Sequence, residues 1–225
     1  MSSPPQLAAH VHVAWLGNQA IVLDVLRNRY VALQGEVADA LATIVQRRDH
    51  ALATPAGIES LFRRGWLTER QDAQPRVESR DYDPPEQDIG ESESFKMAPK
   101  VLGSVGSSLA WQIRTQMALR AFTLSSVLEK CRSKRDSISR APHPETLTRI
   151  VRGFEWSNRL VSSHDRCLMK SIALHRALSF GKVRSFLVIG VRAPPFAAHA
   201  WVQVGSTVLN DKLGHVRQYT PILVV

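Results

Sequence analysis

An acidic, proline-containing stretch divides this chain and constrains its fold more than any other feature. Between residues 72 and 95 there are eight acidic residues and two basic ones, with three prolines and few apolar side chains. Such a composition supplies too little apolar surface to order a chain segment. We therefore predict a flexible acidic linker over residues 71–96, with one module at 1–70 and a second at 97–225.

Length and composition indicate a two-domain globular protein. The chain has 225 residues, of which 44% are hydrophobic, so each module has enough apolar material for a core. Its N-terminus lacks the basic and apolar regions of a secretory signal, and no run of about 18 apolar residues is present to span a membrane. We therefore expect a soluble, cytoplasmic protein with no membrane span.

Charge and cysteine content bear on partners and cofactors. The formal net charge of +9 indicates an acidic partner, and charge alone does not distinguish a nucleic acid, an anionic membrane and an acidic peptide. The two cysteines, Cys131 and Cys167, make no disulfide framework, and no Cys/His pattern has the spacing of a zinc site. We expect no metal and no cofactor.

The first module has the pattern of a small α+β unit. Apolar runs at 10–15, 20–26 and 29–33 predict three strands, the first two separated by the turn LGN. Apolar residues at helical spacing predict a helix over 35–48. A second helix is expected over 54–65, because it begins with a Thr-Pro cap pair and ends at a glycine.

The second module places its helices before its strands, which is typical of an α+β domain with an antiparallel sheet. The helices are predicted over 109–131, 144–161 and 165–181. The strands are predicted over 183–191, 198–204, 207–211 and 219–225.

Cys167 is the stronger of two nucleophile candidates, because it falls at the start of a predicted helix. Ser162, Ser163 and Asp165 are possible N-caps for that helix. Unpaired backbone N–H groups and the helix dipole favour a thiolate there, and the same N–H groups can bind an oxyanion. The alternative is a buried, inert cysteine, which is the more common role of a single cysteine. Cys131 follows a helix in a basic stretch and has no comparable context.

His199 is the candidate base, and Asp211 its candidate partner. Alternation along the strand places His199 with Trp201 and Gln203 on one face and three small aliphatic residues on the other, which is the expected core face. An Asp beside the His would fix its tautomer while the other ring nitrogen takes a proton from the thiol. A structural hydrogen bond at a sheet edge is the alternative.

The turn at Gly205 decides whether the two residues meet, if the strands continue as a regular ladder. A two-residue loop of Gly205 and Ser206 would direct Asp211 away from His199. A three-residue loop that also includes Val204 would pair His199 directly with Asp211. The triad hypothesis therefore predicts the odd loop.

This order of cysteine, histidine and aspartate resembles the papain-like transglutaminase fold. The segments CLMKSIALHRAL, FLVIGV, PPFAAHAWVQV and LND more closely resemble the B proteins of lasso-peptide biosynthesis, which are leader peptidases of ribosomally made peptides. Cys167, His199 and Asp211 fall on the triad positions of that family. Gln203 departs from it, since an acidic residue is more usual there, but this position lies outside the triad.

The first module resembles the PqqD-like recognition element, a winged-helix-type unit of three strands and three helices. In that family a leader peptide adds to the third strand and packs along the last helix. The resemblance therefore implies leader-binding residues on one strand and one helix of this chain. They are Tyr30, Val31, Ala32, Leu33, Ile58, Leu61 and Phe62.

Together these resemblances imply a cysteine peptidase that removes the leader of a lasso precursor. The freed core amine would pass to an asparagine-synthetase-like macrolactam synthetase as partner. Three alternatives stay open: acyl transfer to an amine by the same triad, a non-catalytic carrier of the precursor, and a winged-helix DNA binder. The last is disfavoured because the excess positive charge lies beyond residue 97, away from any recognition helix, so no nucleic-acid partner is expected.

Overall fold

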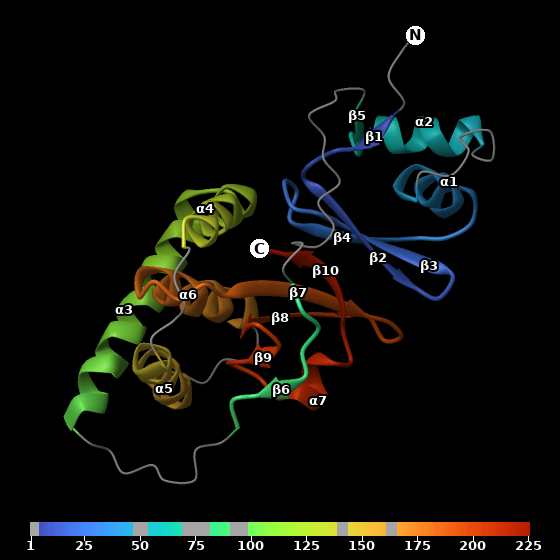
Figure 1. Cartoon of the computed structure of the whole chain (residues 1–225). Helices are drawn as coiled ribbons and strands as arrows, with labels where there is room; N and C mark the ends of the chain where they lie inside the picture. Colours follow the sequence, from blue (N-terminus) through green and yellow to red (C-terminus); the bar gives the residue numbers. More distant parts are fainter. Residues whose placement is uncertain (1–4, 47–53, 69–81, 91–98, 139–143, 161–165) are drawn as a thin grey trace. The chain divides into compact units, whose positions relative to one another are not determined.

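The computed structural model describes residues 5–46, 54–68, 82–90, 99–138, 144–160 and 166–225 (Figure 1). The chain forms two compact units, Met1–Glu78 and Ser79–Val225. Among the described helices, none combines the length and the apolar character needed to cross a membrane.

The first unit is a three-stranded antiparallel sheet with two helices. The sheet has the order β2-β3-β4, and a short second sheet pairs β1 with β5. Each predicted strand and helix of this unit coincides with an element of the structure. The elements are β1 (Gln6–Leu7), β2 (Val11–Leu16), β3 (Gln19–Asp24), β4 (Arg29–Leu33), α1 (Glu36–Val45), α2 (Pro55–Arg63) and β5 (Leu67–Thr68). The PqqD-like resemblance implies a third helix, whereas residues 5–46 and 54–68 contain two.

The cap residues read from the sequence hold α2 in place. The Thr54 hydroxyl accepts a hydrogen bond from the Gly57 N–H at 3.2 Å, and Gly65 ends the helical segment with a φ of +71°. Trp66 then enters the core with no exposed surface and donates from Nε1 to the buried carboxylate of Asp24 at 3.0 Å. The end of α2 is thereby fixed to the end of β3.

The second unit has four long helices: α3 (Pro99–Ala121), α4 (Leu124–Asp136), α5 (Pro144–Leu160) and α6 (Cys167–Phe180). The prediction of one continuous helix over 109–131 was wrong. The chain breaks after Ala121, because Thr123 is extended and its hydroxyl accepts from the Ser126 N–H to begin α4. The break separates α4 from α3, and both helices contact α6.

The strands of the second unit form one five-stranded sheet of order β10-β7-β8-β9-β6. They are β6 (Gln87–Asp88), β7 (Phe186–Arg192), β8 (Ala197–Val204), β9 (Thr207–Val208) and β10 (Thr220–Val224), with the short helix α7 (Leu213–Val216) before the last. All neighbours are antiparallel except β6 and β9, which are parallel. The sheet is therefore antiparallel, as predicted, with one added edge strand.

The prediction of a linker over 71–96 was wrong for residues 82–90. The Ile89 N–H donates to the Val208 carbonyl at 3.0 Å, and the Gln203 side chain donates to the Asp83 carbonyl at 2.7 Å. Tyr82 packs edge-on against Phe186. Backbone pairing with β9 orders these residues despite their acidic composition. The rest of the predicted linker, 71–81 and 91–96, lies outside the described residues.

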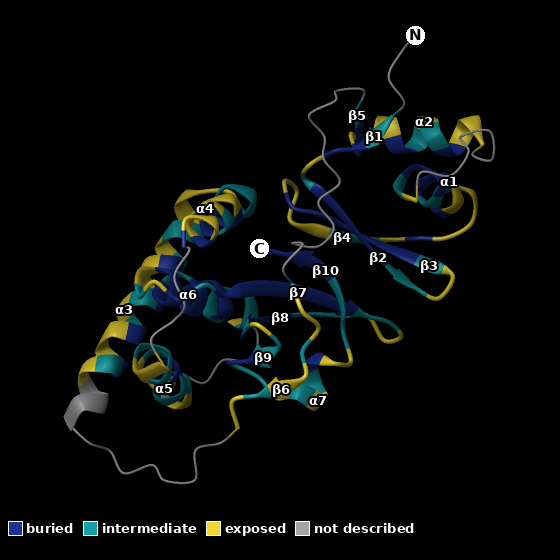
Figure 2. Ribbon diagram, in the orientation of Figure 1, coloured by how far each residue is buried: buried dark blue, intermediate teal, exposed yellow. Residues whose placement is uncertain are grey.

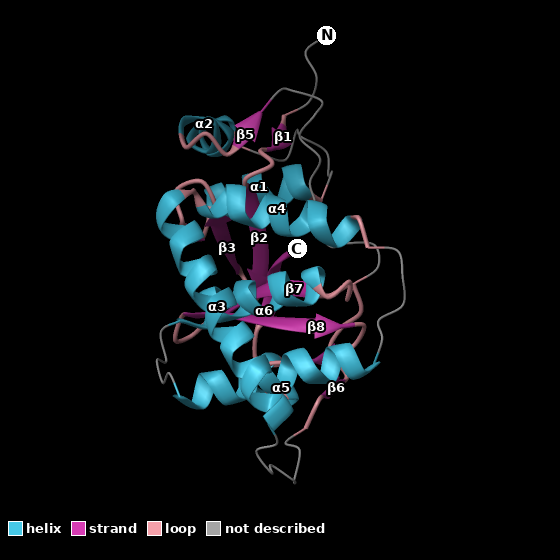
Figure 3. Ribbon diagram, turned by 90° about the vertical axis from the view of Figure 1, so that its left-hand side faces the viewer, coloured by secondary structure: helices cyan, strands magenta, loops and turns pink. Residues whose placement is uncertain are grey.

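Both faces of β8 are covered, which corrects the expectation of a single core face. Trp201 and Gln203 are as fully buried as Val202. The neighbouring strand β7 is coloured as buried along most of its length (Figure 2). Helix α6 contacts β8, and Figure 3 shows α3, α5 and α6 of the second unit gathered on one side of its sheet. Trp201 belongs to a separate cluster that includes Val216 of α7 and Val224 of β10. His199 therefore lies on a covered face.

Gly190 tests how tightly the strand opposite His199 is packed. The two residues pair across β7 and β8, and a Cβ at Gly190 would lie 2.8 Å from the Trp201 ring and 2.9 Å from the Tyr219 Cβ. We predict that Gly190→Ala lowers the free energy of unfolding by about 1–3 kcal/mol, measured by urea denaturation.

Gly106→Ala on α3 is the matched control, because a Cβ at Gly106 would have no neighbouring atom within 4 Å among the described residues. It should raise the free energy of unfolding by roughly 0.5–1 kcal/mol, since alanine is the better helix former. Equal effects of the two substitutions would contradict this packing.

Candidate active site

Cys167 is the first residue of α6 and is half-buried. The residue before it, Arg166, is the N-cap and makes no side-chain cap bond, so the prediction of a Ser or Asp cap is not met by the helix start observed. Ser162, Ser163 and Asp165 themselves lie outside the described residues. Among the described residues no side chain caps this helix, and the backbone N–H groups of a first turn favour a negative charge such as a thiolate at Cys167.

The pKa of the Cys167 thiol is lowered from its ordinary value. The main cause is a hydrogen bond with His199, which outweighs the opposing effect of burial. The charge of His199 and backbone hydrogen bonds from Ala200 and Leu168 act in the same direction. Cys167 thus has the environment of a thiolate rather than of a structural cysteine.

His199 lies between Cys167 and Asp211. Its Nε2 hydrogen-bonds the Asp211 Oδ2, which leaves Nδ1 for the thiol. Burial by itself lowers the pKa of His199, but the hydrogen bonds to Asp211 and Cys167 and their charges raise it to about 9. A positive imidazole beside a thiolate is therefore favoured over a neutral pair.

Asp211 accepts hydrogen bonds from three donors. Oδ2 accepts from His199 and also from His215 Nδ1 at 2.9 Å, and Oδ1 accepts from the Lys212 N–H at 2.7 Å. Burial raises the pKa of this carboxyl, but the hydrogen bonds from the two histidines lower it by more than burial raises it, so the net shift is downward. The carboxylate is thus ionised and fixed in orientation.

The prediction of a three-residue loop between β8 and β9 was wrong. Val204 pairs with Thr207, so the loop is the two-residue turn of Gly205 and Ser206. Asp211 still reaches His199, because β9 ends at Val208 and the ladder does not extend to residue 211. Loop length therefore does not determine whether Asp211 and His199 meet.

Asn210 belongs to the site although the sequence did not indicate it. Its Oδ1 accepts from the Val202 N–H at 2.7 Å, where a regular strand would offer a backbone carbonyl. Its Nδ2 donates to the Ser171 hydroxyl at 2.9 Å, and that hydroxyl donates to the Ala200 carbonyl at 2.8 Å. Ser171 is fully buried on α6, one turn after Cys167. This network ties together the three segments that hold the candidate residues.

His215 is also new, and its spacing gave little signal. It lies four residues after Asp211 on the short helix α7, and its ring centroid is 4.8 Å from that of His199. The Tyr219 ring lies 5.3 Å from His199 and 5.4 Å from His215. The imidazole of His199 is therefore confined by two neighbouring rings as well as by Asp211.

The cluster of His199, Asp211 and His215 offers three potential metal ligands within 4.8 Å of one another. Two imidazoles and a carboxylate are ligands that zinc accepts. In the structure these atoms are joined by hydrogen bonds through Asp211 Oδ2, which account for their closeness without an ion. The sequence-based expectation that the site needs no metal stays a prediction.

Cys131 has the opposite character to Cys167. It is buried on α4, and burial raises the pKa of its thiol to about 11. A thiol of this kind is neutral at physiological pH and a poor nucleophile.

The predicted leader-binding residues lie in the first unit. Strand β4 pairs only with β3 within the described residues, so its other side is an edge of the sheet. Among the helix positions, Phe62 is exposed and Ile58 is half-buried, whereas Leu61 is fully buried in the core. Leu61 therefore packs the unit instead of facing a ligand. On the strand, Tyr30 and Val31 are half-buried, Ala32 is exposed and Leu33 is buried.

Replacing His215 tests whether it positions Asp211. His215→Ala removes one hydrogen bond to a carboxylate, so we predict that the rate of Cys167 alkylation by iodoacetamide near pH 7 falls up to about 10-fold. His215→Asn keeps an N–H near the position of Nδ1 and should retain most of the rate. If both variants react as fast as the unsubstituted chain, His215 does not act through Asp211.

Residues 109–224 match the family described as the transglutaminase-like superfamily. The match covers more than half of the chain and includes Cys167, His199 and Asp211.

The chain is also similar to one curated protein, over a shorter segment. The chain is 51% identical over 45 residues to the microcin J25-processing protein McjB of Escherichia coli. The matched residues are 20% of this chain and 22% of that protein, so the chain spans about a fifth of the relative it matches. No solved structure matches the chain. With over half of its length matched by one family, the chain belongs to the transglutaminase-like superfamily.

Proposed function

We propose that this protein is a cysteine peptidase that binds and removes the leader of a ribosomally synthesised lasso precursor peptide. The observation that carries the proposal is the hydrogen bond of His199 to Asp211, together with the lowering of the pKa of the Cys167 thiol by His199. Membership of the superfamily supports a cysteine-dependent enzyme. The relative's role in processing microcin J25 supports a peptide precursor as substrate.

The reaction would proceed through a thioester. The Cys167 thiolate attacks the carbonyl carbon of the last leader residue, and backbone N–H groups at the start of α6 stabilise the oxyanion. The His199 imidazolium gives its proton to the leaving amine, which becomes the free N-terminus of the core peptide. His199 then takes a proton from water, which attacks the thioester and releases the leader as an acid.

The leader would bind to the first unit by adding a strand to β4. Main-chain hydrogen bonds along that edge provide affinity, and alternate side-chain contacts provide selectivity. Ala32 and Phe62 are the exposed residues among the positions proposed for this role, with Tyr30, Val31 and Ile58 half-buried beside them. Holding the leader on one unit raises its effective concentration at the cysteine of the other.

The product explains the partner that we propose. Hydrolysis leaves a free amine on the core peptide, and a macrolactam synthetase of the asparagine-synthetase type would consume that amine to close a ring. Transfer of the acyl group to an amine is the second candidate, because the same Cys, His and Asp arrangement occurs in a transglutaminase-like domain.

Cysteine variants test the proposal on the full chain with a cognate precursor. Cys167→Ala should reduce cleavage at least ~10⁴-fold, because the nucleophile is removed, whereas Cys131→Ala should retain the rate. Mass spectrometry separates the two chemistries: hydrolysis adds water to the leader, and transfer adds the amine.

A second substitution tests the proposed leader-binding surface. Phe62→Ser should raise KM for the precursor and leave kcat unchanged. Leu26→Ser, a change at another exposed apolar residue of the first unit, is the control and should alter neither constant.

A chelator tests whether the reaction needs a metal ion, and it should leave the rate of cleavage unchanged. Undiminished cleavage by the Cys167 variant would exclude this mechanism, and loss of cleavage on chelation would favour a metal at His199, Asp211 and His215.

A further inference from the structure

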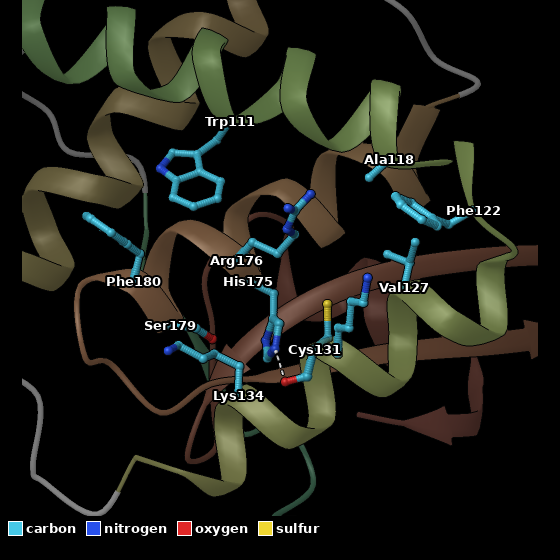
Figure 4. A pocket seen from close by; sticks show the side chains of 11 residues that line it. Trp111, Ala118, Phe122, Val127, Cys131, Lys134, His175, Arg176, Ser179 and Phe180 are labelled. Carbon is cyan, nitrogen blue, oxygen red and sulfur yellow. Dashed lines mark hydrogen bonds between the residues drawn. The ribbon is translucent and has the colours of Figure 1, made fainter. Parts of the chain in front are cut away.

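The second unit contains an apolar cavity of about 280 Å³ that none of Cys167, His199 and Asp211 lines (Figure 4). Its walls come from α3, α4 and α6. Trp111 and Phe180 lie together at one end, with ring centroids 5.7 Å apart, and Phe122 and Val127 lie at the other (Figure 4). The cavity is therefore a groove between three helices.

Large aromatic side chains are left in solvent at this groove. Phe180 is 73% exposed and Phe122 is 54% exposed, and Trp111 between the helices is half-buried. Folded chains seldom leave aromatic side chains grouped at the rim of a cavity unless a partner covers them.

The rim of the groove is cationic. Lys130 and Lys134 are exposed one turn apart on α4. Arg176 of α6 also lines the cavity, with its guanidinium 5.6 Å from the centre of the Trp111 ring. Among the described residues that line the cavity none is acidic, and neither lysine forms an ion pair with a described carboxylate. The Lys130 ammonium lies 4.5 Å from the centre of the Phe122 ring, and Arg176 donates to the Thr115 hydroxyl at 3.0 Å.

The floor of the groove is neutral and holds one unsatisfied polar group. Burial lowers the pKa of His175 to about 4 and raises that of the Cys131 thiol to about 11, so neither carries a charge near pH 7. Ser179 is only 2% exposed, and its hydroxyl has no hydrogen-bond partner among the residues that the structure describes. A buried hydroxyl without a partner is costly, and it offers a hydrogen bond to whatever enters the cavity.

We propose that this groove docks an acidic, amphipathic helical segment of a partner protein. An apolar side chain of that segment would enter between Trp111, Phe122 and Phe180, while its carboxylates would face the cationic rim. The volume is small for a whole ligand molecule, for which about 300–1,000 Å³ is usual, and suits a side-chain anchor. Grooves between helices bind amphipathic helices in this way.

A membrane surface fits the groove less well. Binding to anionic lipid favours cations spread over a protruding basic face. Here Lys130, Lys134 and Arg176 line a cavity instead. The proposal does not depend on peptidase activity, since Cys167 is not part of the groove.

A designed peptide provides the probe. It carries leucines at i, i+3, i+4 and i+7 of a helix, glutamates at the other positions and a fluorescein label. Binding to the full chain is followed by fluorescence anisotropy. We expect Phe180→Ser and Lys134→Glu each to weaken binding at least ~10-fold, as substitutions of central anchor residues do. The effect of Lys134→Glu should shrink at high salt.

Matched variants make the same chemical changes elsewhere. Leu26→Ser removes another exposed apolar residue, and Arg149→Glu reverses another exposed charge, on α5. Both should leave the dissociation constant within about 2-fold of the unsubstituted chain. Cys167→Ala should also bind normally, which separates this site from the proposed peptidase.

Several results would overturn the proposal. The proposal fails if the designed peptide does not bind the full chain. It also fails if Phe180→Ser and Lys134→Glu leave the affinity for the peptide unchanged. Another is binding of vesicles of anionic phospholipid that depends on the same two residues, which would assign the groove to a membrane. Self-association in sedimentation experiments that both variants abolish would assign it to a second copy of the chain.

Discussion

The hydrogen bond from His199 to Asp211 is the interaction on which the rest of the site depends. It leaves Nδ1 of the ring for Cys167. Burial lowers the pKa of the imidazole, but the hydrogen bonds and charges of Asp211 and Cys167 together raise it to about 9. The backbone ladder does not bring Asp211 to this position, because β9 ends three residues earlier. Side chains after the strand do so instead, with His215 sharing the same carboxylate oxygen.

The scaffold supports this contact by joining a helix start to a strand. Helix α6 places Cys167 at its first residue, and β8 places His199 on a face that is covered. Ser171 and Asn210 then connect α6, β8 and the segment that carries Asp211 through buried hydrogen bonds. A site held by buried side chains on rigid elements keeps its geometry better than one carried on loops.

Local patterns were enough to predict most elements. The three candidate residues were chosen from local patterns and a family resemblance, and their catalytic roles stay a prediction. The cap at Thr54 and the alternation around His199 are each determined by neighbours in sequence. The errors have a different origin, since each needed tertiary information. Backbone pairing with β9 orders residues 82–90 against their composition, and the early end of β9 makes loop parity irrelevant. His215 shows its role only once α7 is folded beside Asp211.

Titration of the Cys167 thiol tests whether His199 holds a thiolate in this site. In a Cys131→Ala background the thiolate absorbance in the ultraviolet comes from Cys167 alone. We predict a thiolate that persists well below the ordinary cysteine pKa of about 8.5 and that His199→Asn eliminates at neutral pH. A thiol that titrates at its ordinary pKa, with or without His199, would contradict it.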